Sequence, residues 1–210
     1  MIEYVQAHNP DDRVIARAAA ILREGGLVAY PTDSSWGIGC SSESKKGLEN
    51  LTRLREDKRS QFSLICSSHS QISTIANFDT AIFKILKRHL PGPYVFILNS
   101  IKKIEKKISI KRPEIGIRIP DHVIPVRLVE ELGAPIFSLT ASDKMIDVYS
   151  EDPGYAEEHL FECGWELEGI EAVSLIIDSG EALEKRLSTV VRLDYDQVEL
   201  VRPGKGVWEY

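Results

Sequence analysis

The chain has 210 residues, of which 43% are apolar and 28% are charged, with a formal net charge of −6. This length suits one domain with a sizeable core, and the composition excludes a largely disordered chain. The acidic balance argues against bulk affinity for nucleic acid, although a local basic groove can coexist with an acidic exterior.

The first part of the chain alternates strand and helix patterns. An Asn-Pro-Asp-Asp cap at 9–12 opens a helix, and Gly25-Gly26 ends it before an apolar run. Leu48, Leu51 and Leu54 share one face of a second helix. In chain order, we predict an edge strand at 2–7, a helix from about 10 to 23, a strand at 27–30, a helix at 44–55 and a strand at 62–66.

Strand and helix patterns also fill the rest of the chain. Leu-Pro-Gly-Pro at 90–93 breaks a helix and leads into the apolar run 94–98, which we expect to be a central strand. Lysines and isoleucines alternate over 101–111, which fits either a strand or a solvated loop edge. The other predicted elements are helices at 79–89, 123–132 and near 154–163, and strands at 115–120, 135–139, 172–178, 189–193 and 198–201, with a polar connection at 140–153.

The order of these elements predicts the fold class. Strands mix with helices throughout, and no internal repeat or linker-like shift in composition interrupts them. We therefore expect a single α/β domain over residues 1–210, with a twisted mixed β-sheet flanked by helices.

Cysteine spacing and hydropathy exclude several classes of protein. The three cysteines are far apart and form no CxxC pair, so we expect neither a disulfide framework nor a structural metal. The N-terminus lacks a signal pattern, and no stretch approaches the roughly 20 apolar residues that span a bilayer. We expect a cytoplasmic protein with no membrane partner.

Residues 30–40, with the sequence YPTDSSWGIGC, are the strongest local indication of function. Pro31 tends to end the preceding strand, so a polar loop is expected on a rigid element. Gly37 and Gly39 would let the backbone approach a ligand where a Cβ would clash. Thr32 and Ser34 fit either ligand binding or simple turn formation, and Trp36 fits either base stacking or core packing.

Further polar segments follow the other predicted strands. In an α/β sheet such strand-end loops converge on one crevice, and hydroxyls combined with cations suit phosphate. Arg118 stands in an otherwise apolar strand, so it must either form a structural ion pair or face a cleft. The charged run 55–59 is either part of this site or a solvated helix end. The histidines show no metal-like spacing.

Six motifs together resemble one family. YPTDSSWGIGC, PGPYVFIL, GIRIP, APIFSLTAS, LSTVV and VRPG occur in the order and spacing of the YrdC/YciO family, from about Ala18 to Gly204. This family contains the threonylcarbamoyl-AMP synthases of tRNA modification and their paralogues. The resemblance implies a YrdC-like α/β domain whose large, positively charged concave groove binds ATP or an AMP-type nucleotide. It also implies threonine and bicarbonate as substrates and double-stranded RNA or tRNA as a partner. Mg²⁺ can accompany the nucleotide but is not required by the resemblance.

The resemblance also assigns a set of nucleotide- or substrate-binding positions, but no catalytic residue and no metal ligand. These positions are Thr32, Ser34, Arg55, Lys58, Arg59, Arg118, Ser138, Thr140, Ser142, Ser188 and Arg202.

Three sites depart from the synthase pattern. The lysine-x-arginine pair of the synthases falls on Arg55 and Asp57, and the threonine of their PGPLT motif falls on Val95. Their serine-x-asparagine pair falls on Thr140 and Ser142. An aspartate would place a negative charge where a triphosphate lies, unless Lys58 or Arg59 replaces the lost cation through a shift of the loop.

These departures resemble the YciO branch of the family. We therefore expect a YciO-like paralogue that binds an adenine nucleotide, double-stranded RNA or tRNA, and that handles threonylcarbamoyl-AMP. One alternative is an active L-threonylcarbamoyladenylate synthase, and another is a non-catalytic RNA-binding module. For RNA, the candidate basic residues at the rim of the groove are Lys45, Lys46, Arg53, Lys58, Arg59, Lys84, Lys87 and Arg88.

Overall fold

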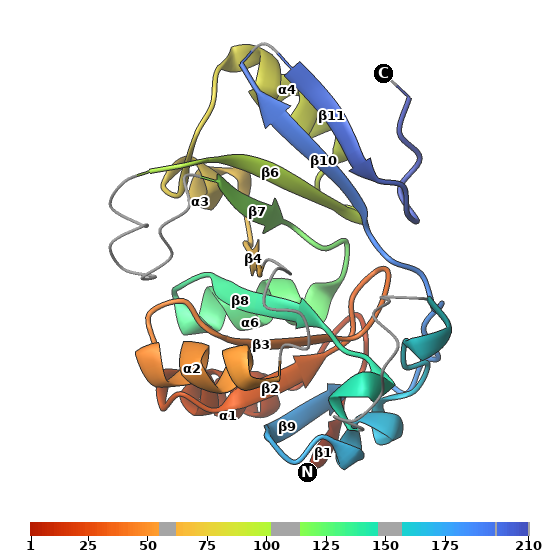
Figure 1. Ribbon diagram of the computed structural model, residues 1–210. Helices are drawn as coiled ribbons and strands as arrows, with labels where there is room; N and C mark the ends of the chain where they lie inside the picture. Colours follow the sequence, from red (N-terminus) through yellow and green to blue (C-terminus); the bar gives the residue numbers. More distant parts are fainter. Residues whose placement is uncertain (55–61, 102–113, 147–156, 196, 210) are drawn as a thin grey trace.

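A computed structural model describes residues 1–54, 62–101, 114–146, 157–195 and 197–209 (Figure 1). Within these residues the strands form one 11-stranded sheet in the order β1-β9-β2-β3-β8-β4-β7-β6-β10-β11, and β5 pairs with β6 beside this path. The strands are β1 (Ile2–Tyr4), β2 (Leu27–Tyr30), β3 (Gly37–Ser41), β4 (Ser63–Ile65), β5 (Ala76–Asn77), β6 (Tyr94–Ser100), β7 (Glu114–Arg118), β8 (Ile136–Thr140), β9 (Val173–Asp178), β10 (Thr189–Asp194) and β11 (Gln197–Arg202).

The sheet is mixed, as predicted. β9 runs parallel to both β1 and β2, and β4–β7 and β6–β10 are also parallel pairs. The remaining neighbours pair antiparallel, including β3 with β8 and β6 with β7. The strand at 94–98 lies inside the sheet, between β7 and β10, so its predicted position is confirmed.

The helices begin and end at the residues that favour caps. Asp11, Ser44 and Asp79 each accept a hydrogen bond from a backbone N–H of the first turn, and Gly133 ends its helix with a φ of 75°. These helices are α1 (Asp12–Arg23), α2 (Lys45–Arg53), α4 (Thr80–His89) and α6 (Val123–Leu132), together with the short α3 (His69–Ser73).

The lower part of the sheet separates two hydrophobic clusters. In β2, Leu27 and Ala29 belong to the larger cluster, whereas Val28 and Tyr30 belong to the smaller one beside α1 and α6. Alternate side chains of a strand point to opposite faces, so the two clusters lie on opposite faces of β2. A continuous sheet with a core on both faces confirms the predicted single α/β domain flanked by helices.

Two predictions of local structure were wrong. Residues 37–41, expected as part of a polar loop, form β3, whose five residues are all buried between β2 and β8. The helix near 154–163 is not formed in its described part. There, Glu157–His159 is a 3₁₀ turn, and Leu160 pairs with Ser142. The carboxylate of Glu157 accepts a hydrogen bond of 2.9 Å from the Leu187 backbone, so tertiary contacts override the helical pattern.

Two other predictions concern segments that lie partly outside the described residues. Residues 102–113 contain nearly all of the Lys/Ile segment, and the predicted helix at 44–55 ends in α2 at Arg53, just before residues 55–61. Among the described helices, none is long and apolar enough to cross a bilayer.

Candidate functional site

The loop after β2 is organised by Thr32. Its Oγ1 accepts hydrogen bonds of 3.2 Å from the backbone N–H groups of Ser34 and Ser35, and it donates one of 2.6 Å to the Ser35 carbonyl. This arrangement is a threonine-stabilised turn, so Thr32 does form the turn that was one of its two predicted roles. The turn also holds the Asp33 and Ser34 side chains in fixed positions.

Arg118 joins this loop to the end of β7. Arg118 is 6% exposed, and its Nη2 donates hydrogen bonds to Thr32 Oγ1 at 3.2 Å and to Ser34 Oγ at 2.9 Å. The same nitrogen forms an ion pair with Asp33. The buried arginine therefore forms an ion pair, and its partner is an aspartate that we had not assigned to the site.

The ion pair has two buried atoms that the protein does not satisfy. Arg118 Nε and Asp33 Oδ2 each lack a hydrogen-bond partner in the described structure. An unsatisfied buried polar atom costs roughly 1–3 kcal/mol, more when it is charged. Both atoms are shielded from solvent, so a ligand could satisfy them only after the loop that follows β2 has moved.

Ser188 and Arg202 extend the network from the loop to the start of β10. Ser188 Oγ lies 3.1 Å from Ser34 Oγ, and the Ser188 carbonyl accepts hydrogen bonds from Arg202 Nη2 at 2.8 Å and Nε at 3.3 Å. We call Thr32, Asp33, Ser34, Arg118 and Ser188 the Arg118 network. Arg202 fixes the Ser188 backbone.

Ser138 accepts a hydrogen bond from Tyr30, the first residue of the YPTDSSWGIGC motif. Tyr30 is fully buried, and its hydroxyl donates a hydrogen bond of 2.8 Å to Ser138 Oγ. Burial raises the pKa of Tyr30 above its ordinary value, with the Ser138 hydrogen bond and Arg118 opposing the shift. The phenol therefore remains a donor at neutral pH.

The glycines of this motif have another role than the one expected. A Cβ at Gly37 would lie 2.9 Å from the Tyr30 ring, and a Cβ at Gly39 would lie 2.8 Å from its hydroxyl. The space over Gly37 is thus filled by Tyr30 and the space over Gly39 by Ile136 and Tyr30, so the expectation that these glycines admit a ligand was wrong. Trp36 is fully buried and donates a hydrogen bond to the Glu162 carbonyl at 3.2 Å, which confirms packing instead of stacking on a base.

Thr140 and Ser142 lie at the end of β8, beside the same loop. Thr140 pairs with Gly37, and the following Ala141 N–H donates to the Trp36 carbonyl at 2.9 Å. Ser142 is 3% exposed and precedes the 3₁₀ turn η1 (Asp143–Met145). The structure therefore brings β2, β7, β8 and β10 together around one loop, as the strand-end argument predicted.

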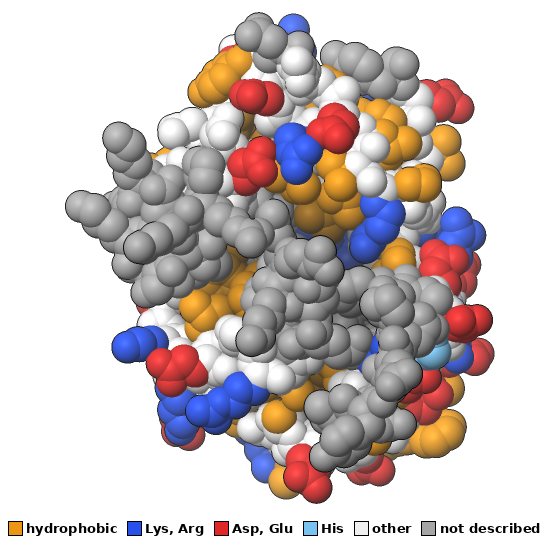
Figure 2. Space-filling model, viewed as in Figure 1, with side chains coloured by type: hydrophobic (Ala, Val, Ile, Leu, Met, Phe, Trp, Pro, Cys, Tyr) orange, Lys and Arg blue, Asp and Glu red, His pale blue; other side chains and the backbone are white. Residues whose placement is uncertain are grey.

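Several residues predicted to bind nucleotide or RNA do not lie in the Arg118 network. Arg55, Asp57, Lys58 and Arg59 lie outside the described residues. The other candidate RNA-binding residues lie on two helices, α2 in the lower part of the molecule and α4 at the top (Figure 1): Lys45, Lys46 and Arg53 on the first, and Lys84, Lys87 and Arg88 on the second. Figure 2 shows Lys and Arg side chains gathered over α2 at the lower left of this face.

His122 stands beside the site as the N-cap of α6. Its Nδ1 accepts a hydrogen bond of 3.2 Å from the Ile124 backbone N–H. Burial lowers the pKa of His122 below its usual value, and the carboxylates of Asp33 and Glu181 oppose the shift. The described residues contain no group of three or more His, Cys, Asp or Glu side chains that could hold a metal ion.

These features define an α/β domain with a polar site where strand ends converge. The family model Sua5_yciO_yrdC, described as telomere recombination, matches residues 20–204. The chain therefore belongs to the Sua5/YciO/YrdC family, as the six sequence motifs indicated.

Individual relatives agree with this assignment. The chain is 33% identical over 205 residues to the uncharacterized protein YciO of Escherichia coli, covering 97% of this chain and 95% of the relative. The crystal structure of E. coli YciO matches with a TM-score of 0.81 over 99% of this chain and 97% of that one. The threonylcarbamoyl-AMP synthase of Rattus norvegicus is 27% identical over 209 residues, covering 97% of this chain and 70% of the relative.

A more distant structure shares the fold. The crystal structure of P. abyssi Sua5 complexed with L-threonine has a TM-score of 0.79 at 24% identity, over 97% of this chain and 57% of that one. The fold expected from the sequence is thus confirmed by two solved structures.

Proposed function

We propose that this chain is a YciO-like paralogue of the threonylcarbamoyl-AMP synthases, and that its Arg118 network binds threonylcarbamoyl-AMP or its components, threonine and an adenine nucleotide. The observation that supports this most is the pair of unsatisfied buried atoms, Arg118 Nε and Asp33 Oδ2. A donor and an acceptor fixed in one ion pair suit a ligand that has a carboxylate beside an N–H group.

Threonine and its carbamoyl derivative both have these two groups. The carboxylate would accept from Arg118 Nε, and the amino or carbamate N–H would donate to Asp33 Oδ2. L-threonine is the ligand named for the P. abyssi Sua5 complex, and the rat relative is named a threonylcarbamoyl-AMP synthase. The hydroxyls of Ser34 and Ser188, 3.1 Å apart, supply further hydrogen bonds near the same atoms.

The paralogue reading is favoured over active synthesis by the altered positions. Asp57 and Val95 stand where the resemblance places a cation and a hydroxyl, and the chain is more similar to YciO (33%) than to the rat synthase (27%). With ATP, threonine and bicarbonate we expect little release of pyrophosphate. Turnover typical of the synthases would establish the alternative.

Isothermal titration calorimetry with L-threonine, AMP, ATP and threonylcarbamoyl-AMP tests the binding site. Arg118→Lys keeps the charge but removes the planar fork and Nε, so binding should weaken about tenfold or more. Arg127→Lys is the matched control, because Arg127 is 41% exposed on α6 and pairs with Asp12. Equal affinities in the two variants, or no binding of any of the four ligands, would reject the proposal.

Duplex RNA binding is a second candidate, and three exposed basic residues on α2 favour it: Lys45, Lys46 and Arg53. The double variant Lys45→Ala/Lys46→Ala should weaken duplex binding and flatten its dependence on salt, whereas Lys87→Ala on α4 should change binding less. A salt response that is flat in the wild type would count against an RNA-binding role.

A further inference from the structure

The chain turns back after β11 and runs beside the start of β10 (Figure 1). We call residues 202–208 the strap. It begins with Arg202, whose guanidinium donates two hydrogen bonds to the Ser188 carbonyl. The Ser188 hydroxyl lies on the other side, 3.1 Å from Ser34 Oγ in the Arg118 network. The strap therefore contacts the backbone of a residue whose side chain belongs to the candidate site.

The strap also binds the residues on either side of Ser188. The Lys205 N–H donates to the Leu187 carbonyl at 2.8 Å, and Thr189 Oγ1 donates to the Gly206 carbonyl at 2.6 Å. Both Leu187 and Thr189 are buried, so water competes little for these hydrogen bonds. Three consecutive residues are thus bonded to the strap, which fixes the backbone of Ser188 and with it the direction of its side chain.

Two glycines bring the strap into direct contact with its neighbours. A Cβ at Gly204 would lie 2.4 Å from the Leu187 carbonyl oxygen and 2.6 Å from the Thr189 nitrogen. A Cβ at Gly206 would lie 2.4 Å from the Tyr94 ring of β6. The strap backbone therefore packs against the start of β10 at one glycine and against β6 at the other. A displacement of the strap would be transmitted to both neighbours, because close-packed contacts leave no free space.

Aromatic packing anchors the far end of the strap. The Tyr94 hydroxyl donates to the Val207 carbonyl at 2.8 Å. The centroid of the Trp208 ring lies 4.8 Å from that of His89 on α4 and 6.0 Å from that of Phe96 on β6. Ring pairs at such separations attract each other beyond the burial of their surface. Trp208 thus holds the strap against α4 and β6, which lie outside the Arg118 network.

We propose that Trp208 is a positioning residue for the Arg118 network. It acts through the strap on Ser188, whose hydroxyl must stay beside that of Ser34 to offer a hydrogen bond to a ligand. The inference rests on the proposed function for the identity of the ligand. The coupling from Trp208 to Ser188 and Ser34 is a property of the protein without ligand, so it is tested separately.

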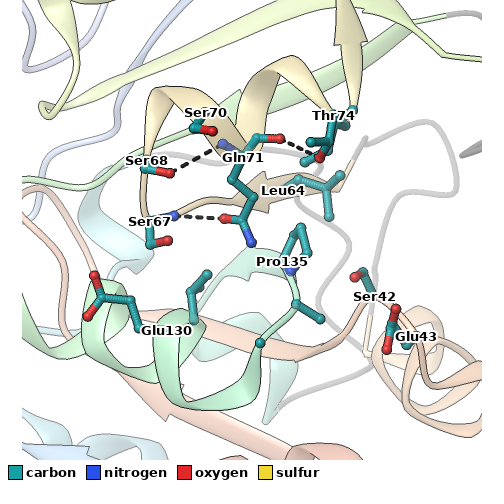
Figure 3. A pocket seen from close by; sticks show the side chains of 14 residues that line it. Ser42, Glu43, Leu64, Ser67, Ser68, Ser70, Gln71, Thr74, Glu130 and Pro135 are labelled. Atoms are coloured by element: carbon teal, nitrogen blue, oxygen red, sulfur yellow. Dashed lines mark hydrogen bonds between the residues drawn. The ribbon is translucent and has the colours of Figure 1, made fainter.

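The first test compares two-dimensional NMR spectra of the ¹⁵N-labelled full chain without ligand. Trp208→Ala should shift the amide signals of Ser188 and Ser34, and Trp208→Phe should largely restore them. Trp165→Ala is the matched control, because it removes an indole that is 62% exposed in the turn before β9. The amide of Gly133, which lines the separate cavity between α3 and α6 (Figure 3), is the reference that should not move. Unchanged Ser188 and Ser34 signals in Trp208→Ala, or equal shifts in Trp165→Ala, would overturn the proposal.

The second test is a double-mutant cycle with L-threonine as the probe, measured by calorimetry. Ser188→Ala and Trp208→Ala should each weaken binding about threefold to tenfold, the value of one hydrogen bond, and Trp208→Phe should bind nearly as the wild type does. The double variant should bind no more weakly than Ser188→Ala, because Trp208 acts through the hydroxyl that is already absent. Additive losses would show a general destabilisation and overturn the proposal. If the wild type binds no threonine, the proposed function fails, whereas the amide shifts alone decide the role of Trp208.

Discussion

The hydroxyl of Tyr30 donates a hydrogen bond of 2.8 Å to Ser138 Oγ, across 108 residues of sequence. The bond links the smaller hydrophobic cluster to β8, and both partners are buried. It passes through the space that Gly37 and Gly39 leave open. Three residues of the YPTDSSWGIGC motif therefore cooperate in positioning a serine that the resemblance assigns to ligand binding.

Removing this hydroxyl should cost stability. Tyr30→Phe leaves the buried Ser138 hydroxyl without its donor, so the free energy of unfolding should fall by about 1–2 kcal/mol. Urea denaturation followed by tryptophan fluorescence measures the change. Tyr94→Phe is the control, because the Tyr94 hydroxyl donates to the Val207 carbonyl in an exposed position and should contribute less. Equal losses in the two variants would show that burial of the Tyr30–Ser138 hydrogen bond does not increase its contribution to the free energy of unfolding.

A methyl group at Gly39 should be more damaging. In Gly39→Ala, the Cβ would lie 2.4 Å from Ile136 Cγ2 and 2.9 Å from the Phe137 carbonyl, and neither neighbour can move freely in β8. We expect a loss of about 1–3 kcal/mol on thermal or urea unfolding. Gly169→Ala is the matched control, because its contact is the flexible end of the half-exposed Ile146 side chain. A tolerated Gly39→Ala would mean that β3 can move away from β8.

Acid should destabilise the fold through His122. Burial lowers the pKa of His122 in the folded state, so between that pKa and 6.5 the unfolded chain binds more protons. The His122 contribution is therefore present above pH 6.5 and is lost as the pH falls through the folded-state value. His122→Asn keeps an N-cap acceptor and should flatten this part of the stability curve. Parallel profiles of folding stability against pH for the two proteins would show that His122 does not cause the loss of stability in acid.

Thiol labelling should distinguish the cysteines. Burial raises the pKa of Cys40 and of Cys66 to about 12, and both side chains are fully buried. At pH 8, one thiol per chain should react rapidly with a disulfide reagent, and all three should react in urea. The Cys163→Ser variant should lose the rapid reaction, since Cys163 is only partly buried. Rapid labelling of Cys40 in the native protein would indicate local opening of β3.

The sequence predicted most strands and helices because their signals are local. The Asn-Pro-Asp-Asp segment at 9–12 and the glycine at 133 mark helix ends by their own chemistry, and the structure has helix ends there, with Asp11 as the N-cap of α1. β3 was missed because its Gly-Ile-Gly-Cys-Ser sequence has weak strand propensity. Its strand state results from pairing with β2 and β8, which lie on either side of it in the sheet.

The site was predicted by residue type, but its contacts were not. Thr32, Ser34, Arg118 and Ser188 meet in one network, as strand-end convergence indicated. Asp33 was not assigned, although it directly follows Thr32, because nothing local shows that an aspartate turns toward an arginine 85 residues away. The only available signal was Arg118 itself, because a cation in an apolar strand needs a partner.

The contact between Ser34 and Ser188 spans 154 residues, and β1 pairs with β9 from the far end of the chain. A growing polypeptide emerges from the ribosome N-terminus first, so the two contacts cannot form until Ser188 and β9, respectively, have been synthesised. Such distant pairings also slow folding, because a long loop must close before any contact compensates for the lost entropy. Synthesis that stops before β10 would therefore yield a chain with the YPT loop but without a complete site.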